Sequence, residues 1–143
     1  MSESDSNAGT CYLVAGTDQA KAALGGSEVE ITRLPFRVGR ESRGFSMSRK
    51  GLMVERRRPG ASPSNDLYLV ESGEVMHISR NHFQIEEEDG GYALVDRGST
   101  CGTIVGGETV GGGNRGGRIR LPGGASILVG TESSPYLFTF EIR

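Results

Sequence analysis

The amino-acid sequence predicts an all-β fold, a single sandwich of about ten or eleven short strands. Three observations support this prediction. Apolar and polar residues alternate over short segments, which is the period of a strand with one buried face. Glycine makes up 23 of the 143 residues, which suits many tight turns between strands. The length fits one domain with a core, and no segment of helical periodicity reaches a useful length.

The N-terminal part is expected to contribute a tail and three strands. Residues 1–9 are polar and acidic and are predicted to be a disordered tail, so the domain is expected over residues 10–143. The segment Gly16–Gly26 is small and Ala-rich, which leaves a loop and a single helical turn as open alternatives. The strands are expected at Thr10–Ala15, Glu28–Leu34 and Phe36–Val38.

A basic segment follows at about residues 41–64, where the strand periodicity is lost. Between Arg33 and Arg58 there are nine basic residues against two acidic ones. A loop of this length in a compact domain is usually functional or disordered. We therefore expect a basic loop insertion, with one short strand left open around Leu52–Val54. Its charge favours an anionic partner, and a solvated loop is the alternative.

The stretch Ile78–Gly107 is predicted to contain a β-hairpin with a polar loop at one end. Its two strands are separated by an Asp-Gly signal, which is typical of tight hairpin turns. Pairing of the strands brings Ser79 and Arg80, at the start of the first, to the same end of the sheet as Thr100 and Cys101, which follow the second. We expect a binding site at that end. Further strands are expected within Leu67–Val70, Arg118–Leu121, Ala125–Gly130 and Tyr136–Ile142.

The composition argues against several classes of protein. The two cysteines, Cys11 and Cys101, form no CxxC motif and no disulfide framework. His77 and His82 are the only histidines, and no metal-ligand spacing or nucleophile–base set stands out, so we expect no metal, no cofactor and no enzyme activity. No apolar run reaches membrane-spanning length, and the N-terminus lacks the features of a signal peptide. We expect a cytoplasmic protein without a membrane partner.

Four short motifs occur in order along the chain. Together they resemble the forkhead-associated (FHA) domain family, whose pattern is Gly-Arg, a short gap, Asn-Asp, Ser-x-x-His and then Gly-Ser-Thr-Asn-Gly-Thr. The resemblance covers nearly the whole chain, from about Tyr12 to Ile142, and implies an eleven-stranded β-sandwich that binds phosphothreonine peptides through loops at one end. The motifs are Gly39-Arg40, Asn65-Asp66-Leu67, Ser79-Arg80-Asn81-His82 and Asp96-Arg97-Gly98-Ser99-Thr100-Cys101-Gly102-Thr103.

The resemblance also implies roles for individual residues. Arg40 and Ser79 would bind the phosphate, and Arg80 would reach the phosphate or the peptide. Thr100 and Cys101 would face the peptide. A phosphothreonine carries close to two negative charges and three acceptor oxygens, which suit the forked donors of arginine. The structural residues of the motifs would be Gly39, His82 and Gly102.

Two departures from the family pattern open an alternative. Cys101 stands where the family has an asparagine that bonds the peptide backbone, and a thiol is a weak donor and a weak acceptor. Arg40 and Asn65 are separated by 24 residues, where the family usually has only a few. The leading hypothesis is a phosphothreonine-binding signalling module. The alternative is an FHA fold with a degraded phosphosite, acting as a phospho-independent interaction or oligomerisation domain.

Nucleic acid is a third candidate partner, for the basic loop. Only Phe36 and Phe45 lie there as stacking platforms, so nucleic-acid binding is not expected. The sequence indicates neither the oligomeric state nor the partner, nor the kinase that modifies it. FHA domains often belong to larger proteins, so the sequence leaves open whether this chain is complete or part of a larger protein.

Overall fold

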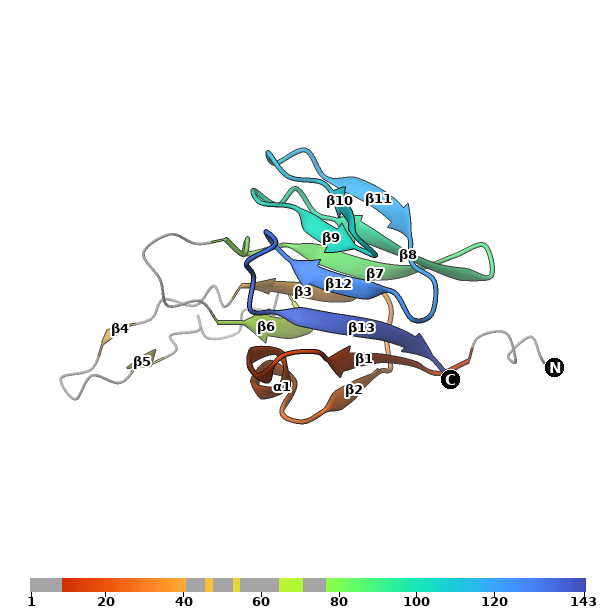
Figure 1. The fold of residues 1–143 in the computed structure, drawn as a ribbon, viewed down its shortest axis with the longest axis horizontal. Helices are drawn as coiled ribbons and strands as arrows, with labels where there is room; N and C mark the ends of the chain where they lie inside the picture. The colour runs from red at the N-terminus through yellow and green to blue at the C-terminus, as the bar shows by residue number, and fades with distance from the viewer. Residues whose placement is uncertain (1–8, 41–45, 48–52, 55–64, 71–76) are drawn as a thin grey trace, which may run out of the picture.

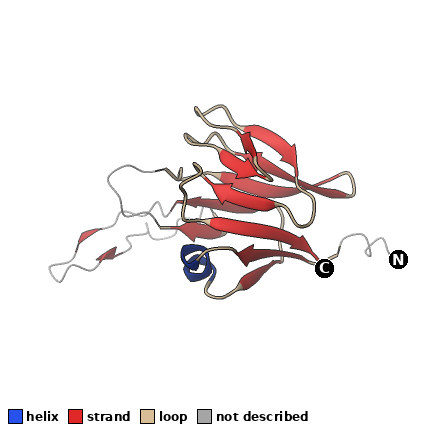
Figure 2. Ribbon diagram, in the orientation of Figure 1, coloured by secondary structure: helices blue, strands red, loops and turns tan. Residues whose placement is uncertain are grey.

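The computed structural model consists of two β-sheets packed face to face (Figures 1 and 2). The structure describes residues 9–40, 46–47, 53–54, 65–70 and 77–143. The larger sheet has six strands, in the spatial order β10 (Glu108–Val110), β9 (Thr103–Val105), β12 (Ser126–Val129), β13 (Leu137–Ile142), β1 (Cys11–Ala15) and β2 (Glu28–Ile31). The smaller sheet has five, in the order β11 (Gly117–Arg120), β8 (Gly91–Asp96), β7 (Phe83–Glu88), β3 (Phe36–Arg40) and β6 (Leu67–Leu69). These two sheets confirm the predicted eleven-stranded sandwich.

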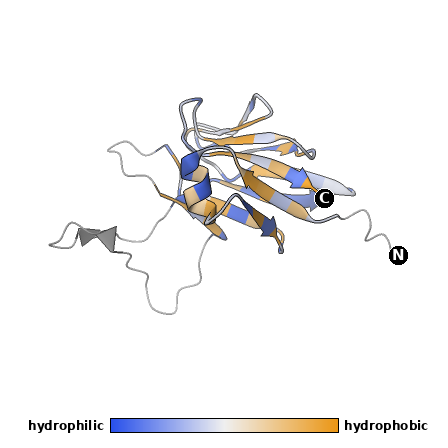
Figure 3. Cartoon of the chain, turned by 60° about the horizontal axis from the view of Figure 1, so that its bottom comes forward, coloured by the Kyte–Doolittle hydropathy of each residue, from blue (hydrophilic) through white to orange (hydrophobic). Residues whose placement is uncertain are grey.

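Alternation along the strands builds the core between the sheets (Figure 3). In β13, Phe138 and Phe140 are fully buried, and in β7 the same is true of Phe83 and Ile85. The rings of Tyr92 and Phe140, which come from opposite sheets, make an edge-to-face contact with centroids 5.4 Å apart. Each fully buried side chain of this size stabilises the fold by about 1.5–3 kcal/mol. The core therefore stabilises the two sheets from which the loops extend.

The predicted hairpin is formed by β7 and β8 and is confirmed. Glu88 pairs with Gly91, and the two residues between them have positive φ angles of 46° at Asp89 and 78° at Gly90. Positive φ at both central residues is the geometry of a two-residue hairpin turn that matches the twist of the strands. At the other end of the hairpin, Phe83 pairs with Asp96. The residues just before β7 and just after β8 therefore lie at the same end of the sheet.

The segment between β1 and β2 contains a short helix, α1 (Asp18–Leu24). The sequence had left a loop and a helical turn open there. The Thr17 side chain accepts a hydrogen bond from the backbone N–H of Ala20, which caps the N-terminus. Gly25 ends the helix in the left-handed conformation with φ of 75°, as expected of a glycine at this position. Among the described residues, no helix is long and apolar enough to cross a membrane.

Two predictions concern parts of the chain that the structure describes little. The predicted N-terminal tail lies outside the described residues except for Gly9. The predicted basic insertion at 41–64 lies outside them except for a two-stranded antiparallel sheet, formed by β4 (Ser46–Met47) and β5 (Met53–Val54).

The strands nearest the two termini pair with one another at one end of the sandwich. β1 and β13 are antiparallel, with Cys11 opposite Ile142. Beyond them, Thr10 and Arg143 exchange two backbone hydrogen bonds of 2.8 and 2.7 Å. This end lies opposite the C-terminal end of β3 and the loop that follows β8 (Figure 1).

Candidate binding site at the loop end of the sandwich

The end of β3 and three loops meet at one end of the sandwich. We call this region the loop end: it comprises Arg40 and residues 77–82, 97–102 and 111–116. The backbone N–H of Arg40 donates to the carbonyl of Ser79 at 2.9 Å. The N–H of Thr100 donates to the Ser79 hydroxyl oxygen at 3.0 Å. These contacts confirm that the residues before β7 and those after β8 come together.

Ser79 lies at the centre of the loop end. Its hydroxyl oxygen is fixed by the Thr100 N–H, and its own N–H donates to Nδ1 of His82 at 3.0 Å. Among the described residues, the hydroxyl proton of Ser79 has no acceptor. The side chain is therefore held in position while keeping one donor for a ligand.

His82 connects two of the loops through hydrogen bonds. Its ring is fully buried, and Nε2 lies 2.7 Å from the carbonyl oxygen of Gly102. Because Nδ1 accepts from the Ser79 N–H, the ring proton resides on Nε2 and is donated to that carbonyl. Gly102 itself has a φ of 84°, in the region that favours glycine. The neutral imidazole thus joins the Ser79 loop to the Thr100 loop.

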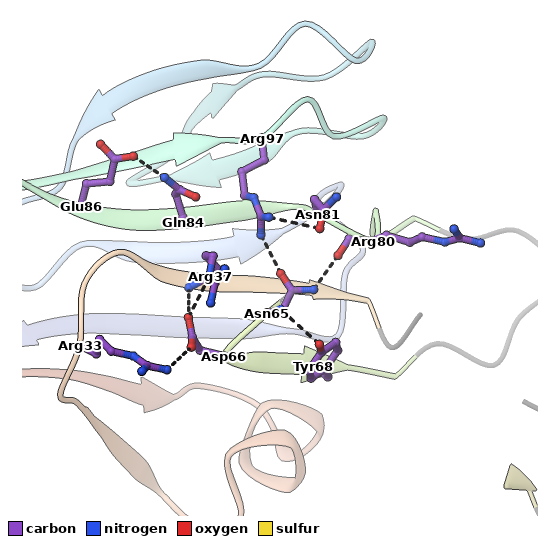
Figure 4. A network of polar contacts seen from close by, with 10 residues as sticks. All are labelled: Arg33, Arg37, Asn65, Asp66, Tyr68, Arg80, Asn81, Gln84, Glu86 and Arg97. Carbon is purple, nitrogen blue, oxygen red and sulfur yellow. Dashed lines mark hydrogen bonds and ion pairs between the residues drawn. The ribbon is translucent and has the colours of Figure 1, made fainter. Parts of the chain in front are cut away.

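Arg40 lies beside Ser79. One guanidinium nitrogen, Nη1, donates to the carbonyl of Ile78 at 3.2 Å, and the side chain is half-buried. A guanidinium has five N–H donors in a planar fork, and the part of the chain that the structure describes leaves most of them available for a ligand. The structure therefore brings two of the predicted phosphate ligands, Arg40 and Ser79, together. The third, Arg80, is exposed, and its side chain extends away from the neighbouring polar network (Figure 4).

Gly39 allows the backbone of the Ser79 loop to approach β3. A Cβ atom placed on Gly39 would lie 1.9 Å from the carbonyl oxygen of Arg80. The same oxygen accepts a 2.8 Å hydrogen bond from Nδ2 of Asn65. The side chain that every other residue carries would therefore displace both the Arg80 carbonyl and this bond.

Arg97 supports the loop end from the outer face of the smaller sheet (Figure 4). Its guanidinium donates to Oδ1 of Asn65 at 2.7 Å and to Oδ1 of Asn81 at 3.2 Å. Burial, and then the positive charge of Arg37 nearby, lowers the pKa of Arg97 from its ordinary value. The sequence motifs contained Asn65 and Arg97 without indicating this bridge, since the two residues are 32 positions apart.

Asp66 anchors the segment that carries Asn65. Its carboxylate accepts from the backbone N–H of Arg37 at 2.8 Å and from Nε of the same residue at 3.3 Å. Burial acts to raise the pKa of this carboxyl, but the hydrogen bonds and the charge of Arg37, with a further bond from Arg33, prevail and lower it. The start of β6 is thereby fixed to β3.

The loop that displays Thr100 and Cys101 is built on a buried carboxylate. Asp96 is 3% exposed, and Oδ1 accepts from the N–H groups of Gly98 and Ser99 at 3.1 and 2.8 Å. Its Oδ2 accepts from the hydroxyls of Ser99 and Thr103 at 2.6 and 2.9 Å. The loop tip is therefore fixed from within, and Thr100 is exposed while Cys101 is half-buried and free.

Asn114 is a residue of the loop end that sequence reasoning missed. It follows three glycines and matches none of the recognised motifs. Its backbone N–H donates to the Ser99 carbonyl at 3.0 Å, and its Oδ1 lies 3.1 Å from Oγ1 of Thr100, which donates to it. Its exposed side chain thus lies beside the loop tip.

Comparison with known families decides the relationship. The family model of the FHA domain matches residues 37–130, which is more than half of the chain. The chain belongs to the FHA domain family. The comparison with curated protein sequences found no match.

Solved FHA structures share the fold of this FHA domain. The N-terminal FHA domain of S. cerevisiae Rad53p, in complex with a phosphothreonine peptide, is 23% identical, with 94% of each chain covered and a TM-score of 0.58. The FHA domain of an Arabidopsis thaliana hypothetical protein is 17% identical, with 95% of this chain and 87% of that one covered and a TM-score of 0.60. Mycobacterium tuberculosis EmbR, in complex with a low-affinity phosphopeptide, is 19% identical, with a TM-score of 0.58. The match covers 94% of this chain but only 25% of EmbR.

Proposed function

We propose that this FHA domain is a non-catalytic module that binds phosphothreonine in a partner protein, with Arg40 and Ser79 holding the phosphate. The observation that supports the proposal is the Ser79 side chain, which is fixed by the Thr100 N–H on a loop whose backbone is bonded to Arg40. Within the described ranges, its hydroxyl proton has no acceptor and is free for a ligand. A phosphate with nearly two negative charges matches a guanidinium fork and a short hydroxyl bond.

Donors that are already fixed in the free protein favour binding, because no free energy is then spent on ordering their side chains when the ligand binds. The His82 and Asp96 bonds hold the two loops without a ligand. Charge-assisted hydrogen bonds contribute about 1.5–3 kcal/mol each. Two or three of them, less the cost of ordering the peptide, give a Kd on the order of 1 μM, which corresponds to about 8 kcal/mol. Such affinity suits reversible signalling.

The remaining predicted site residues complete the proposal. Thr100 lies at the exposed tip beside Ser79, where it would face the peptide backbone. Arg80 is solvent-exposed and is proposed to contact the phosphate or an acidic group of the peptide. The proposed setting is cytoplasmic.

The test is fluorescence anisotropy with a degenerate phosphothreonine peptide library, with the unphosphorylated library as control. Arg40→Ala is expected to lower the affinity by about tenfold or more, since one charge-assisted bond is lost. Arg120→Ala is the matched control: it removes one exposed arginine at the opposite end of the smaller sheet, and binding should be unchanged. Equal binding of both libraries by the wild-type protein would refute the proposal.

Cys101 favours the second candidate, a degraded phosphosite with a phospho-independent partner. Its thiol offers little to a peptide backbone. A wild-type protein that fails to distinguish the two libraries, together with a Cys101→Asn variant that does distinguish them, would support this second candidate.

A further inference from the structure

The loop end carries a carboxamide, that of Asn114, at a position that none of the four motifs includes. Asn114 lies on the connection between β10 and β11, while the position expected to bond the peptide backbone is Cys101 on the connection between β8 and β9. The two connections lie side by side. The N–H of Gly113 donates to the Thr100 carbonyl at 2.9 Å, and the N–H of Asn114 donates to the Ser99 carbonyl at 3.0 Å.

Glycines bring this connection close to the loop tip. A Cβ on Gly111 would lie 2.3 Å from Cγ of Asp96, the carboxylate that organises the tip. A Cβ on Gly112 would lie 3.8 Å from the backbone carbonyl carbon of Cys101. Gly111, Gly112 and Gly113 all have positive φ angles, of 76°, 94° and 61°. The backbone conformation of these glycines therefore fixes the position of Asn114 beside the loop tip.

The side chain of Asn114 is oriented by Thr100. Oγ1 of Thr100 donates to Oδ1 of Asn114 at 3.1 Å, which leaves the amide nitrogen Nδ2 on the other side of the carboxamide. Among the described residues, Nδ2 has no acceptor, and Asn114 is exposed. An amide nitrogen has two N–H donors, and a main-chain carbonyl is a matching acceptor.

We propose that Asn114 supplies the carboxamide for the peptide main chain in place of Cys101, with Nδ2 donating to a main-chain carbonyl next to the phosphothreonine. The proposal rests on the proposed phosphothreonine binding. It assigns Thr100 a second role, because its hydroxyl fixes which end of the amide faces the peptide. It also explains how a thiol at position 101 is compatible with a functional site.

A purely conformational role for Asn114 makes a different prediction. Its φ is 63°, a left-handed conformation that asparagine tolerates and that glycine adopts freely. Asn114→Gly therefore keeps the backbone and removes only the carboxamide. Asp89, with a φ of 46° in the β7–β8 turn at the far end of the sheet, provides the matched control Asp89→Gly.

The experiment measures phosphothreonine peptide affinity by anisotropy for the wild type, Asn114→Gly and Asp89→Gly, with thermal unfolding to check the fold. Asn114→Gly is expected to weaken binding by about five- to tenfold, the factor for one hydrogen bond, and Asp89→Gly to leave it unchanged. Peptides with an amide-to-ester replacement on either side of the phosphothreonine test the contact itself, because an ester carbonyl is a weaker acceptor. One of the esters should weaken wild-type binding more than it weakens binding to Asn114→Gly.

Cys101→Asn adds a second readout. The gain in affinity from Cys101→Asn should be larger in the Asn114→Gly background than in the wild type, because in the wild type Asn114 already supplies the contact to the peptide main chain. Wild-type affinity in Asn114→Gly, equal ester penalties in both proteins, or an equal gain from Cys101→Asn in both backgrounds would overturn the inference and leave phosphothreonine binding intact. A wild type that binds no phosphothreonine peptide would overturn the proposed function itself.

Discussion

Gly39→Ala is expected to destabilise the domain and to disturb its binding loop through one added methyl group. That Cβ would lie 1.9 Å from the carbonyl oxygen of Arg80 and 2.7 Å from Nδ2 of Asn65. Real Cβ atoms essentially never approach other atoms closer than 3.0 Å, so the Arg80 carbonyl would have to move by about 1.1 Å. The main chain of the loop would move with it.

The magnitude follows from two contributions. Overpacking a tightly packed site costs about 1–3 kcal/mol. Loss of the Asn65–Arg80 hydrogen bond, 2.8 Å long, adds about 1 kcal/mol. The free energy of unfolding should therefore fall by about 2–4 kcal/mol. Because Ser79 precedes Arg80, its hydroxyl should also shift, and phosphothreonine affinity should fall by about tenfold or more.

Urea denaturation and peptide anisotropy measure these two effects on the same samples. Gly26→Ala is the matched control, since a Cβ there meets no atom within 4 Å and its φ is not positive. An unfolding midpoint for Gly39→Ala equal to that of the control would refute the steric reasoning. A lowered midpoint with unchanged affinity would instead refute the link between the Arg80 carbonyl and the Ser79 loop.

Two further predictions concern the supports of the loop end. Asp66→Asn should lower the free energy of unfolding by about 1–2 kcal/mol at pH 7, since the hydrogen bonds from Arg37 lose a charged acceptor. The folded-state pKa of Asp66 is lowered, so its stabilisation is present above the unfolded pKa and is lost as the pH falls through the folded value. Urea midpoints of variant and wild type should therefore converge below pH 3.8, and a constant gap across the acid range would contradict this. His82→Ala should cost about 2–4 kcal/mol because it opens a cavity and leaves the Ser79 N–H and the Gly102 carbonyl unpaired. Thermal unfolding checks this, and an unchanged midpoint would show that the bridge is dispensable.

The parts of the fold that depend on local pattern could be predicted from the sequence. The β7–β8 hairpin follows from alternation and from Asp89-Gly90, because the turn type is fixed by the two residues that form it. The short helix α1 was left open because seven residues carry little periodicity. Its formation depends on a cap from Thr17 and a left-handed Gly25, which are weak signals in isolation.

In the candidate site, too, the features set by local pattern could be predicted from the sequence, and those set by contacts between distant residues could not. Hairpin geometry placed Ser79 and Thr100 at one end of the sheet, and the resemblance to the FHA domain family added Arg40. The contact that makes Gly39 irreplaceable is with a carbonyl about forty positions away, and such a clash is visible only once the loops are placed. Asn114 carries no motif at all, and its place beside Thr100 results from a glycine-rich connection whose course no local pattern specifies.

The pairing of β1 with β13 has a consequence for how the domain can be tethered. Thr10 and Arg143 are neighbours, so sequence joined at either point departs from one pole of the sandwich. The loop end lies at the opposite pole (Figure 1). A partner or linker fused at either terminus would therefore leave the proposed phosphopeptide site at the loop end accessible. Linkers fused at both termini would share one attachment point, and their length would set the effective concentration of the loop end at a tethered target.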